Sequence, residues 1–108
     1  MRSNARSKVF IYYTDHGAPG LVQMPAGNKP VFADELQSVI DFMEKHKMYD
    51  EMIFYVEACE SGSMFPNLRK DQRVFAVTAS DSKKSSYATY CSPDNTINGT
   101  KFGTCLGD

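Results

Sequence analysis

The sequence predicts an α/β fold built on a mainly parallel β-sheet, and three observations lead to this prediction. Strand-sized apolar runs recur at residues 8–14, 52–56 and 74–79. An amphipathic helix pattern lies between the first two runs. Polar or turn-forming residues follow each run. Strands that alternate with crossover segments are typical of parallel sheets, in which both faces of the strands are covered.

Each predicted strand is a continuous apolar run rather than an alternating one. Residues 8–14 are rich in β-branched and aromatic side chains, which favours a strand buried on both faces. The run ends at the loop-forming stretch 15–20. Residues 52–56 and 74–79 give the second and third strands. Short extended pieces at 20–24 and 30–32 flank a turn-rich stretch and predict a small hairpin.

The strongest helix pattern covers residues 33–47. Acidic residues occupy its first turn and basic residues its last, which complements the helix dipole. We therefore interpret His46 as a cation at the helix end rather than as a catalytic group. A short helix is expected within 61–68, a loop at 80–86 and a turn-rich segment from 87 onward. One apolar stripe follows the helical spacing: Leu36, Val39, Ile40 and Met43.

Composition limits the classes of protein that need to be considered. A chain of 108 residues with 42% hydrophobic and 23% charged residues is one globular domain at most. Its formal net charge of −1 gives no reason to expect a nucleic-acid or membrane-surface partner. No apolar run is long enough to span a membrane. The start lacks the apolar core of a signal peptide. The first strand begins almost at once and no closing element follows the last residues, so we expect a fragment of a larger domain.

A histidine and a cysteine follow the first two predicted strands. His16 lies just beyond the first strand and Cys59 just beyond the second. Neighbouring parallel strands end at the same edge of a sheet, where ligands bind, so the two side chains form a candidate pair. An imidazole can take the proton of a thiol that attacks as thiolate, which suits Cys59 as nucleophile and His16 as base. The alternative is a buried core cysteine beside an incidental loop histidine.

Three neighbouring residues have two interpretations each. Gly17 could place its amide, with that of Cys59, in an oxyanion hole, or it could be a simple turn glycine. Glu57 ends an apolar run, where a carboxylate needs a partner; it could accept hydrogen bonds from a substrate amide or form a salt bridge. Asp15 could orient the histidine or cap a loop.

Three cysteines suggest one disulfide and one free thiol. Cys91 and Cys105 are separated by a polar, turn-rich loop. Closing this loop would add roughly 3 kcal/mol in the chain-entropy treatment. The same loop contains the glycosylation sequon Asn98-Gly99-Thr100. A disulfide and a glycan together would indicate the secretory or endolysosomal system.

Two long segments resemble the legumain family of caspase-like cysteine peptidases, the asparaginyl endopeptidases of family C13. They are Val9-Phe10-Ile11-Tyr12-Tyr13-Thr14-Asp15-His16-Gly17 and Phe54-Tyr55-Val56-Glu57-Ala58-Cys59-Glu60-Ser61-Gly62-Ser63. Ser85-Ser86-Tyr87 and Thr104-Cys105-Leu106-Gly107-Asp108 add to the resemblance, which covers nearly the whole chain. It implies a three-layer α/β sandwich around a mainly parallel sheet, of which residues 1–108 are a part.

The resemblance also implies an activity. A family member cuts peptide bonds after asparagine, and more slowly after aspartate in acid, in the lysosome or vacuole; some members also ligate peptides. The resemblance assigns His16 and Cys59 as the catalytic pair and the amides of Gly17 and Cys59 as the oxyanion hole. It places Glu57, Ser85 and Asp108 in the pocket for the substrate asparagine, with Asp15 and Ser86 in support. It also implies a Cys91–Cys105 disulfide like that of plant-type members, and no cofactor.

The resemblance further implies parts beyond these residues. The N-terminal part should carry the first strand, an asparagine supporting the histidine and an arginine of the pocket, and a C-terminal prodomain should cap the zymogen. Three other hypotheses remain: a lipid-anchor transamidase of the same family, an inactive or truncated binding module, and a metal site. The stretch 57–63 argues against the transamidase. The metal site would use Asp15, His16, Glu57 and Cys59, although these lack close metal-ligand spacing.

Overall fold

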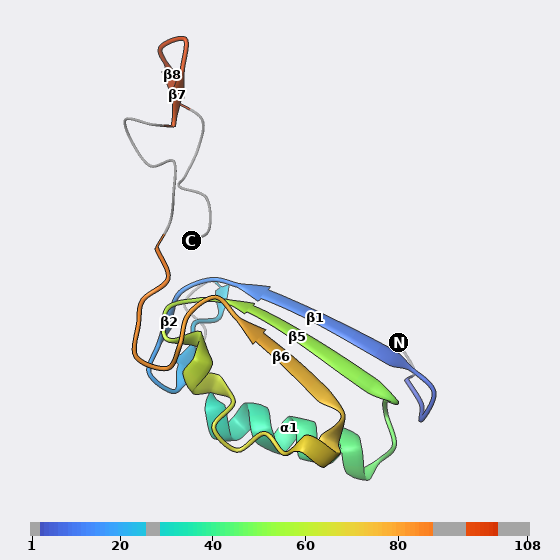
Figure 1. Ribbon diagram of the computed structural model, residues 1–108. Helices are drawn as coiled ribbons and strands as arrows, with labels where there is room; N and C mark the ends of the chain where they lie inside the picture. The colour runs from blue at the N-terminus through green and yellow to red at the C-terminus, as the bar shows by residue number, and fades with distance from the viewer. Residues whose placement is uncertain (1–2, 26–28, 88–94, 102–108) are drawn as a thin grey trace.

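The protein is described here by a computed structural model, which covers residues 3–25, 29–87 and 95–101. Its centre is a three-stranded sheet of β1 (Lys8–Thr14), β5 (Glu51–Glu57) and β6 (Val74–Thr78), with β5 in the middle (Figure 1). Both pairs of neighbouring strands run parallel. The predicted strands and their parallel order are confirmed, with bounds that differ by one residue at β5 and β6.

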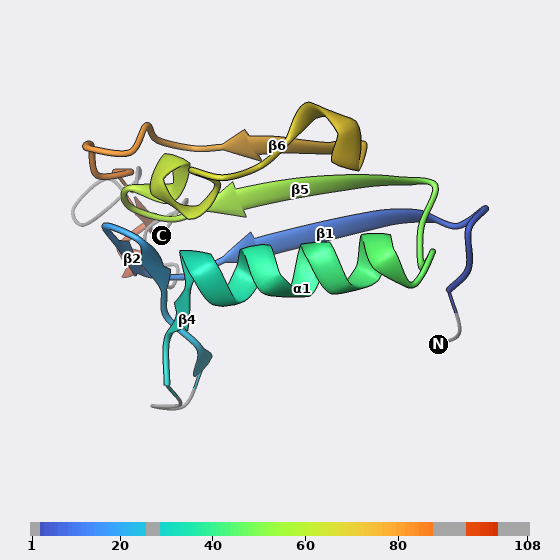
Figure 2. The ribbon, with the colours of Figure 1, turned by 90° about the horizontal axis from the view of Figure 1, so that it is seen from below.

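Helix α1 (Ala33–Lys45) connects the first part of the chain to β5 and lies along one face of the sheet (Figure 2). The Glu35 carboxylate accepts a hydrogen bond from the Phe32 amide at 3.0 Å, which satisfies one donor at the helix start. The helix stops at Lys45, two residues before the predicted end. His46 follows as the C-cap residue, and its ring packs against Phe42 with 4.2 Å between the centroids and the planes tilted by 40°.

A second sheet, two 3₁₀ turns and a hairpin accompany the central sheet and the helix. A second sheet joins β2 (Gly17–Ala18), β3 (Leu21–Val22) and β4 (Val31–Phe32) in antiparallel order, so the predicted small hairpin is one part of a three-stranded unit. Two 3₁₀ turns, η2 (Ser61–Met64) and η3 (Lys70–Gln72), lie between β5 and β6. A hairpin of β7 (Thr96–Ile97) and β8 (Thr100–Lys101) lies in the segment for which the sequence predicted only turns.

The hydrophobic core lies between α1 and the sheet. Ile40 of the helix and Met52 of β5 are each only 1% exposed, and Leu36 and Met43 pack against them. Val39 was expected on the same stripe, but it is 54% exposed, because it lies to the side of the line that Leu36, Ile40 and Met43 form. Other core members come from several elements: Val22, Tyr49, Phe54, Val56, Ala58 and Met64.

A polar network fastens η3 to the helix. Gln72 is 1% exposed, and its side chain bonds to Gln37, to Asp41 and to Glu44. The guanidinium of Arg69 bridges the same two helix carboxylates at 3.2 and 2.8 Å. A buried amide is tolerated only when its donors and acceptor are paired, and here they are.

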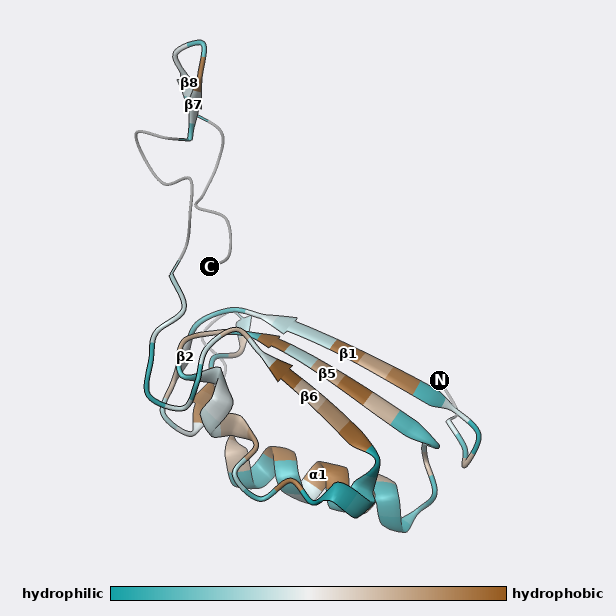
Figure 3. Ribbon diagram, viewed as in Figure 1, coloured by the Kyte–Doolittle hydropathy of each residue, from teal (hydrophilic) through white to brown (hydrophobic). Residues whose placement is uncertain are grey.

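The opposite face of the sheet has no covering element among the described residues. The strands alternate between inward and outward side chains, so the expectation of strands buried on both faces is wrong for this part of the chain. Figure 3 shows apolar residues in all three strands, while the carboxyl-terminal part of β1 is pale. The described residues therefore build two of the three expected layers. Outward side chains form two aligned rows: Phe10, Ile53 and Phe75, then Tyr12, Tyr55 and Val77.

Candidate active site

The carboxyl ends of β1 and β5 lie side by side. Thr14 pairs with Glu57 in the parallel register, and the Asp15 amide donates to the Glu57 carbonyl at 3.2 Å. The segments that follow these two strands therefore start from the same edge of the sheet. This is the geometry that the sequence predicted for the histidine and cysteine segments.

Gly17 lies against the backbone of Cys59. A Cβ added at Gly17 would overlap the Cys59 carbonyl oxygen and would come within 2.9 Å of the Ala58 Cβ and 3.4 Å of the Cys59 nitrogen. Only a glycine allows this close approach of two backbones. The turn that carries His16 and the segment that carries Cys59 are consequently in direct contact.

The thiol of Cys59 is half-buried and free. Its Sγ donates to the backbone carbonyl of Ser86 at 3.4 Å. Glu60, the next residue, adopts the left-handed conformation with φ of 49°, and its amide donates to the Lys84 carbonyl at 2.9 Å. The chain therefore turns sharply directly after the cysteine, which brings the 84–86 segment beside the thiol.

Glu57 finds its partner in a serine rather than in a cation. The Ser86 hydroxyl donates to Glu57 Oε1 at 2.5 Å, while the Ser85 hydroxyl donates to Glu60 Oε1 at 3.1 Å. The Glu57 bond satisfies a carboxylate that would be costly at the end of an apolar strand. Ser86 thus contacts both Glu57, through its side chain, and Cys59, through its carbonyl. Ser85 contacts the residue after the cysteine, not Glu57.

Glu57 also borders a hollow on the uncovered face of the sheet. The hollow has a volume of about 150 Å³. Tyr12 and Tyr55 flank it on neighbouring strands, and the end of β6 closes one side. A carboxylate at the rim of a mixed polar and apolar hollow can accept hydrogen bonds from a donor group of a ligand. Its lining residues are Tyr12, Tyr55, Val56, Glu57, Val77, Thr78 and Ala79.

Asp15 caps its own loop. Its Oδ1 accepts the His16 amide at 2.7 Å, which is the capping alternative that the sequence left open. The Tyr13 hydroxyl donates to the Gln23 carbonyl and lies 3.4 Å from the His16 carbonyl. Burial, followed by the nearby Asp15 charge, raises the pKa of Tyr13 above its ordinary value. Tyr13 therefore stays a neutral donor that holds the histidine turn.

A network of serines, which the sequence did not single out, supports the cysteine segment. Ser61 is fully buried, and its hydroxyl lies 3.1 Å from that of Ser80. Ser80 donates to the Ala58 carbonyl at 3.0 Å, so the loop after β6 holds the residue before the cysteine. Gly62 passes so close to residue 81 that a Cβ would come within 2.9 Å of the Asp81 carbonyl carbon.

Ser63 connects the two loops of the candidate site. Its Oγ accepts the Gly20 amide at 2.7 Å and donates to the Glu60 carbonyl at 2.6 Å. Gly20 forms the turn between β2 and β3 with φ of 76°, a conformation that favours glycine. One hydroxyl thus joins the β2–β3 turn, which follows the histidine, to the residue after the cysteine.

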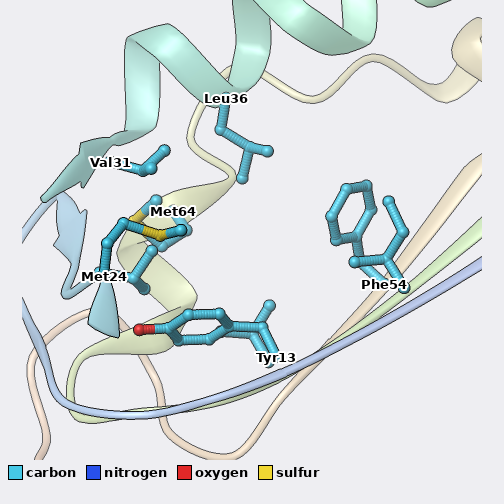
Figure 4. Close-up of a pocket in the computed structure, with 9 residues that line it drawn as sticks. Tyr13, Met24, Val31, Leu36, Phe54 and Met64 are labelled. Carbon is cyan, nitrogen blue, oxygen red and sulfur yellow. The ribbon is translucent and has the colours of Figure 1, made fainter. Parts of the chain in front are cut away.

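A separate apolar cavity lies between the sheet and α1. Figure 4 shows Tyr13, Met24, Val31, Leu36, Phe54 and Met64 around it, and its volume is about 160 Å³. Ile11, Val22 and Val56 complete the lining. None of the predicted catalytic or pocket residues lines it, so this cavity is not the place for a polar substrate side chain.

Of the remaining predicted site residues, one lies within the described part of the chain and three lie outside it. Asn98 lies in the β7–β8 turn, whereas Asp108, Cys91 and Cys105 lie outside the described residues. Within the described ranges, no group of three or more metal-binding side chains is close enough to hold an ion. The same ranges contain no helix with the length and apolarity needed to cross a bilayer.

Comparison with known proteins assigns the chain to a family. The model of the peptidase C13 family matches residues 1–108. The chain therefore belongs to the peptidase C13 family, a class of cysteine peptidases.

Individual relatives agree with that assignment. The chain is 48% identical to the vacuolar-processing enzyme delta-isozyme of Arabidopsis thaliana. It is 46% identical to legumain of Homo sapiens and 41% identical to hemoglobinase of Schistosoma mansoni. Each comparison covers 100% of this chain but only 23–24% of the relative. The chain thus spans about a quarter of the length of the curated relatives it matches.

Proposed function

We propose that the protein containing this chain is a cysteine endopeptidase that hydrolyses peptide bonds after asparagine, and more slowly after aspartate in acid. The observation that carries the proposal is the contact between the Gly17 backbone and the Cys59 backbone, in a chain of the peptidase C13 family. That contact brings a histidine-bearing turn to a free thiol at the carboxyl edge of a parallel sheet, where α/β folds bind their ligands.

In the proposed reaction, His16 accepts the thiol proton and the Cys59 thiolate attacks the carbonyl carbon of the substrate asparagine. The amides of Gly17 and Cys59 stabilise the oxyanion. The amine product leaves with the proton from His16, and water then hydrolyses the thioester. In the resting state the thiol donates to the Ser86 carbonyl, which keeps Sγ in one position beside the loop.

The proposed specificity rests on acceptors at the pocket. A primary amide has two donor hydrogens, so the Glu57 carboxylate suits the asparagine side chain, whereas it would repel the carboxylate of a substrate aspartate until that group is protonated. Ser86 fixes Glu57 from one side at 2.5 Å. Ser85 and Asp108 complete the pocket in this proposal, and Asp15 holds the histidine turn through the His16 amide.

The proposal extends to the cellular setting. The names of the plant relatives support a vacuolar location. The resemblance to the legumain family adds the lysosome as the alternative, and either would be reached through the secretory pathway. A Cys91–Cys105 disulfide and a glycan on Asn98 fit that pathway.

We also propose a C-terminal prodomain that inhibits the zymogen. An amine that replaces water at the thioester would give peptide ligation at the same site.

A kinetic test uses the full-length protein at mildly acidic pH. Fluorogenic peptides that differ only in having asparagine, aspartate or glutamine before the reporter give the specificity. The asparagine peptide should react fastest, and Cys59→Ser and His16→Ala should abolish turnover. An electrophilic probe with asparagine at the reactive carbonyl should label the wild type and not Cys59→Ser. Wild type that is folded yet neither cleaves the peptide nor accepts the probe would refute the proposal and favour the inactive binding module.

A further inference from the structure

The peptide bond between Ala58 and Cys59 has two ends with different surroundings. Its nitrogen is the Cys59 amide of the proposed oxyanion hole, and this amide donates to no protein group among the described residues. Its oxygen is the Ala58 carbonyl, which accepts a hydrogen bond from the Ser80 hydroxyl at 3.0 Å. A peptide group is planar and trans, so its C=O and N–H point in opposite directions. A bond that fixes the Ala58 carbonyl therefore also fixes the direction of the Cys59 amide.

The Ser80 hydroxyl uses all of its hydrogen-bonding capacity in this arrangement. A carbonyl can only accept, so the single proton of the hydroxyl is the one given to Ala58. Its two lone pairs accept from Ser61, once from the amide and once from the hydroxyl, both at 3.1 Å. The Ser61 hydroxyl in turn accepts the Ser80 amide at 3.2 Å. Rotating the Ser80 hydroxyl away from the Ala58 carbonyl would break this set of bonds.

Burial and the central sheet hold the arrangement in place. Ser61 is 0% exposed and Ala58 is 3% exposed, so water has little access to their hydrogen bonds. Ala79, directly before Ser80, donates its amide to the Val56 carbonyl at 3.0 Å, which continues the β5–β6 pairing as far as the serine. Ser80 is thus anchored to the sheet, and its hydroxyl extends that anchor to the peptide before the nucleophile.

We propose that Ser80 is a positioning residue for the oxyanion hole: its hydroxyl orients the Ala58–Cys59 peptide so that the Cys59 amide points at the substrate oxygen on which negative charge develops. This inference rests on the proposed function. Ser80 does not touch the substrate and acts through the Ala58 carbonyl. Its hydrogen bond also polarises the peptide group, which makes the N–H a stronger donor. Donors that are fixed before the reaction stabilise the developing charge without reorganising.

The first test compares two alanine variants of the full-length enzyme. Ser80→Ala should lower kcat for the asparagine peptide by about two- to tenfold with KM nearly unchanged, because it removes one neutral hydrogen bond that acts on the transition state. Ser82→Ala removes an exposed hydroxyl from the same loop and should retain the wild-type kcat. Thermal unfolding shows whether each variant is folded at the assay temperature. Equal kcat values for the two folded variants would overturn the inference.

Two thiol-directed reagents separate the oxyanion hole from the thiol itself. A peptide aldehyde with asparagine at the reactive carbonyl places a tetrahedral oxygen in the hole when Cys59 Sγ adds to its carbonyl carbon. Iodoacetamide is attacked at a saturated carbon, loses iodide and forms no such oxygen. Ser80→Ala should raise the inhibition constant of the aldehyde by about as much as it lowers kcat/KM, and should leave the alkylation rate of Cys59 unchanged. Equal losses with both reagents would mean that Ser80 positions the thiol, and the inference would be wrong.

A second variant and the wild type complete the test. Ser61→Ala removes one bond that holds the Ser80 hydroxyl, so it should show the same pattern with a smaller loss, and it replaces Ser80→Ala if that variant does not fold. If the wild type hydrolyses the asparagine peptide and the variants match it toward peptide and aldehyde, the inference is wrong and the proposed function stands. If folded wild type neither hydrolyses the peptide nor binds the aldehyde, both fail.

Discussion

The backbone of Gly17 lies against the backbone of Cys59, so closely that no side chain fits between them. The contact joins two segments that follow different strands, and it is made by the residue directly after His16. Its existence depends on the parallel pairing of β1 and β5, which ends both strands at one edge.

Gly17→Ala should therefore remove most of the activity of the full-length enzyme. The added Cβ would overlap the Cys59 carbonyl oxygen, which is backbone and cannot swing aside, so the two segments must separate. A misplacement of about 1 Å in a catalytic arrangement costs on the order of 100-fold. The peptide assay measures the loss. Ala18→Gly changes the same turn without adding atoms and should retain activity; equal losses in both variants would contradict this explanation.

Ser63→Ala should lower kcat by roughly tenfold with a small change in KM, because it removes the link between Gly20 and Glu60 that aligns the two loops. Two hydrogen bonds contribute about 0.5–1.5 kcal/mol each to folding stability, so the melting temperature should fall only modestly. Ser38→Ala removes a hydroxyl that bonds within α1 and serves as the control. Equal kcat values for the two variants would show that Ser63 does not position the loops.

Glu57→Gln should reduce kcat/KM for asparagine peptides by at least about 100-fold. The NH2 group of the glutamine, which replaces one carboxylate oxygen, is a donor and cannot accept a hydrogen bond from the substrate amide. Donor groups left without an acceptor in a binding site are strongly disfavoured. Glu51→Gln, at the other end of β5, removes an exposed carboxylate paired with Lys8 and should have no such effect. A Glu57→Gln enzyme with normal kcat/KM would exclude Glu57 from the pocket.

Asp41 should contribute to acid stability. A hydrogen bond from Gln37, together with Gln72 and Arg69, lowers the pKa of Asp41 below the ordinary 3.8. A carboxyl whose pKa is lowered on folding stabilises the folded state above its unfolded pKa, and this contribution is lost as pH falls through the folded pKa. Thermal unfolding measured from neutral to strongly acidic pH should show a smaller acid-induced loss in Asp41→Asn. Asp71→Asn, which removes a more exposed partner of Arg69, is the control; identical profiles would count against the role of Asp41.

Protein made in a eukaryotic secretory host should carry a glycan on Asn98, because the sequon lies at an exposed turn. Glycosidase treatment should shift the mass, Thr100→Ala should remove the shift and Thr100→Ser should retain it. An unchanged mass after glycosidase treatment would rule out this modification.

The sequence predicted the sheet because its strands are continuous apolar runs, and parallel order followed from the helix between the first two. The meeting of the Gly17 turn with Cys59 followed from that order, since parallel strands end together. The hydrogen bonds between loops could not be predicted, because no periodic pattern of residues in the sequence marks them. The hydroxyls of Ser61, Ser63 and Ser80 join loops that are distant in sequence, and no pattern within any one loop reveals the partner.

The failure at the strands has a different cause. Phe10, Ile53 and Phe75 are as apolar as the inward residues, so the sequence alone indicates two covered faces. The described part of the chain supplies a cover for only one. In the same way, Val39 belongs to the apolar side of the helical pattern but lies beyond the reach of the sheet residues.

The two rows of outward side chains have a practical consequence for anyone who expresses residues 1–108 alone. Phe10 and Phe75 would present 63% and 64% of their surface to water, beside four further apolar neighbours. Such a patch promotes self-association, the more so because β1 and β6 have no further strand beside them among the described residues. Recombinant preparation of this segment by itself should yield poorly soluble material, and a longer polypeptide that supplies the missing cover should remedy it.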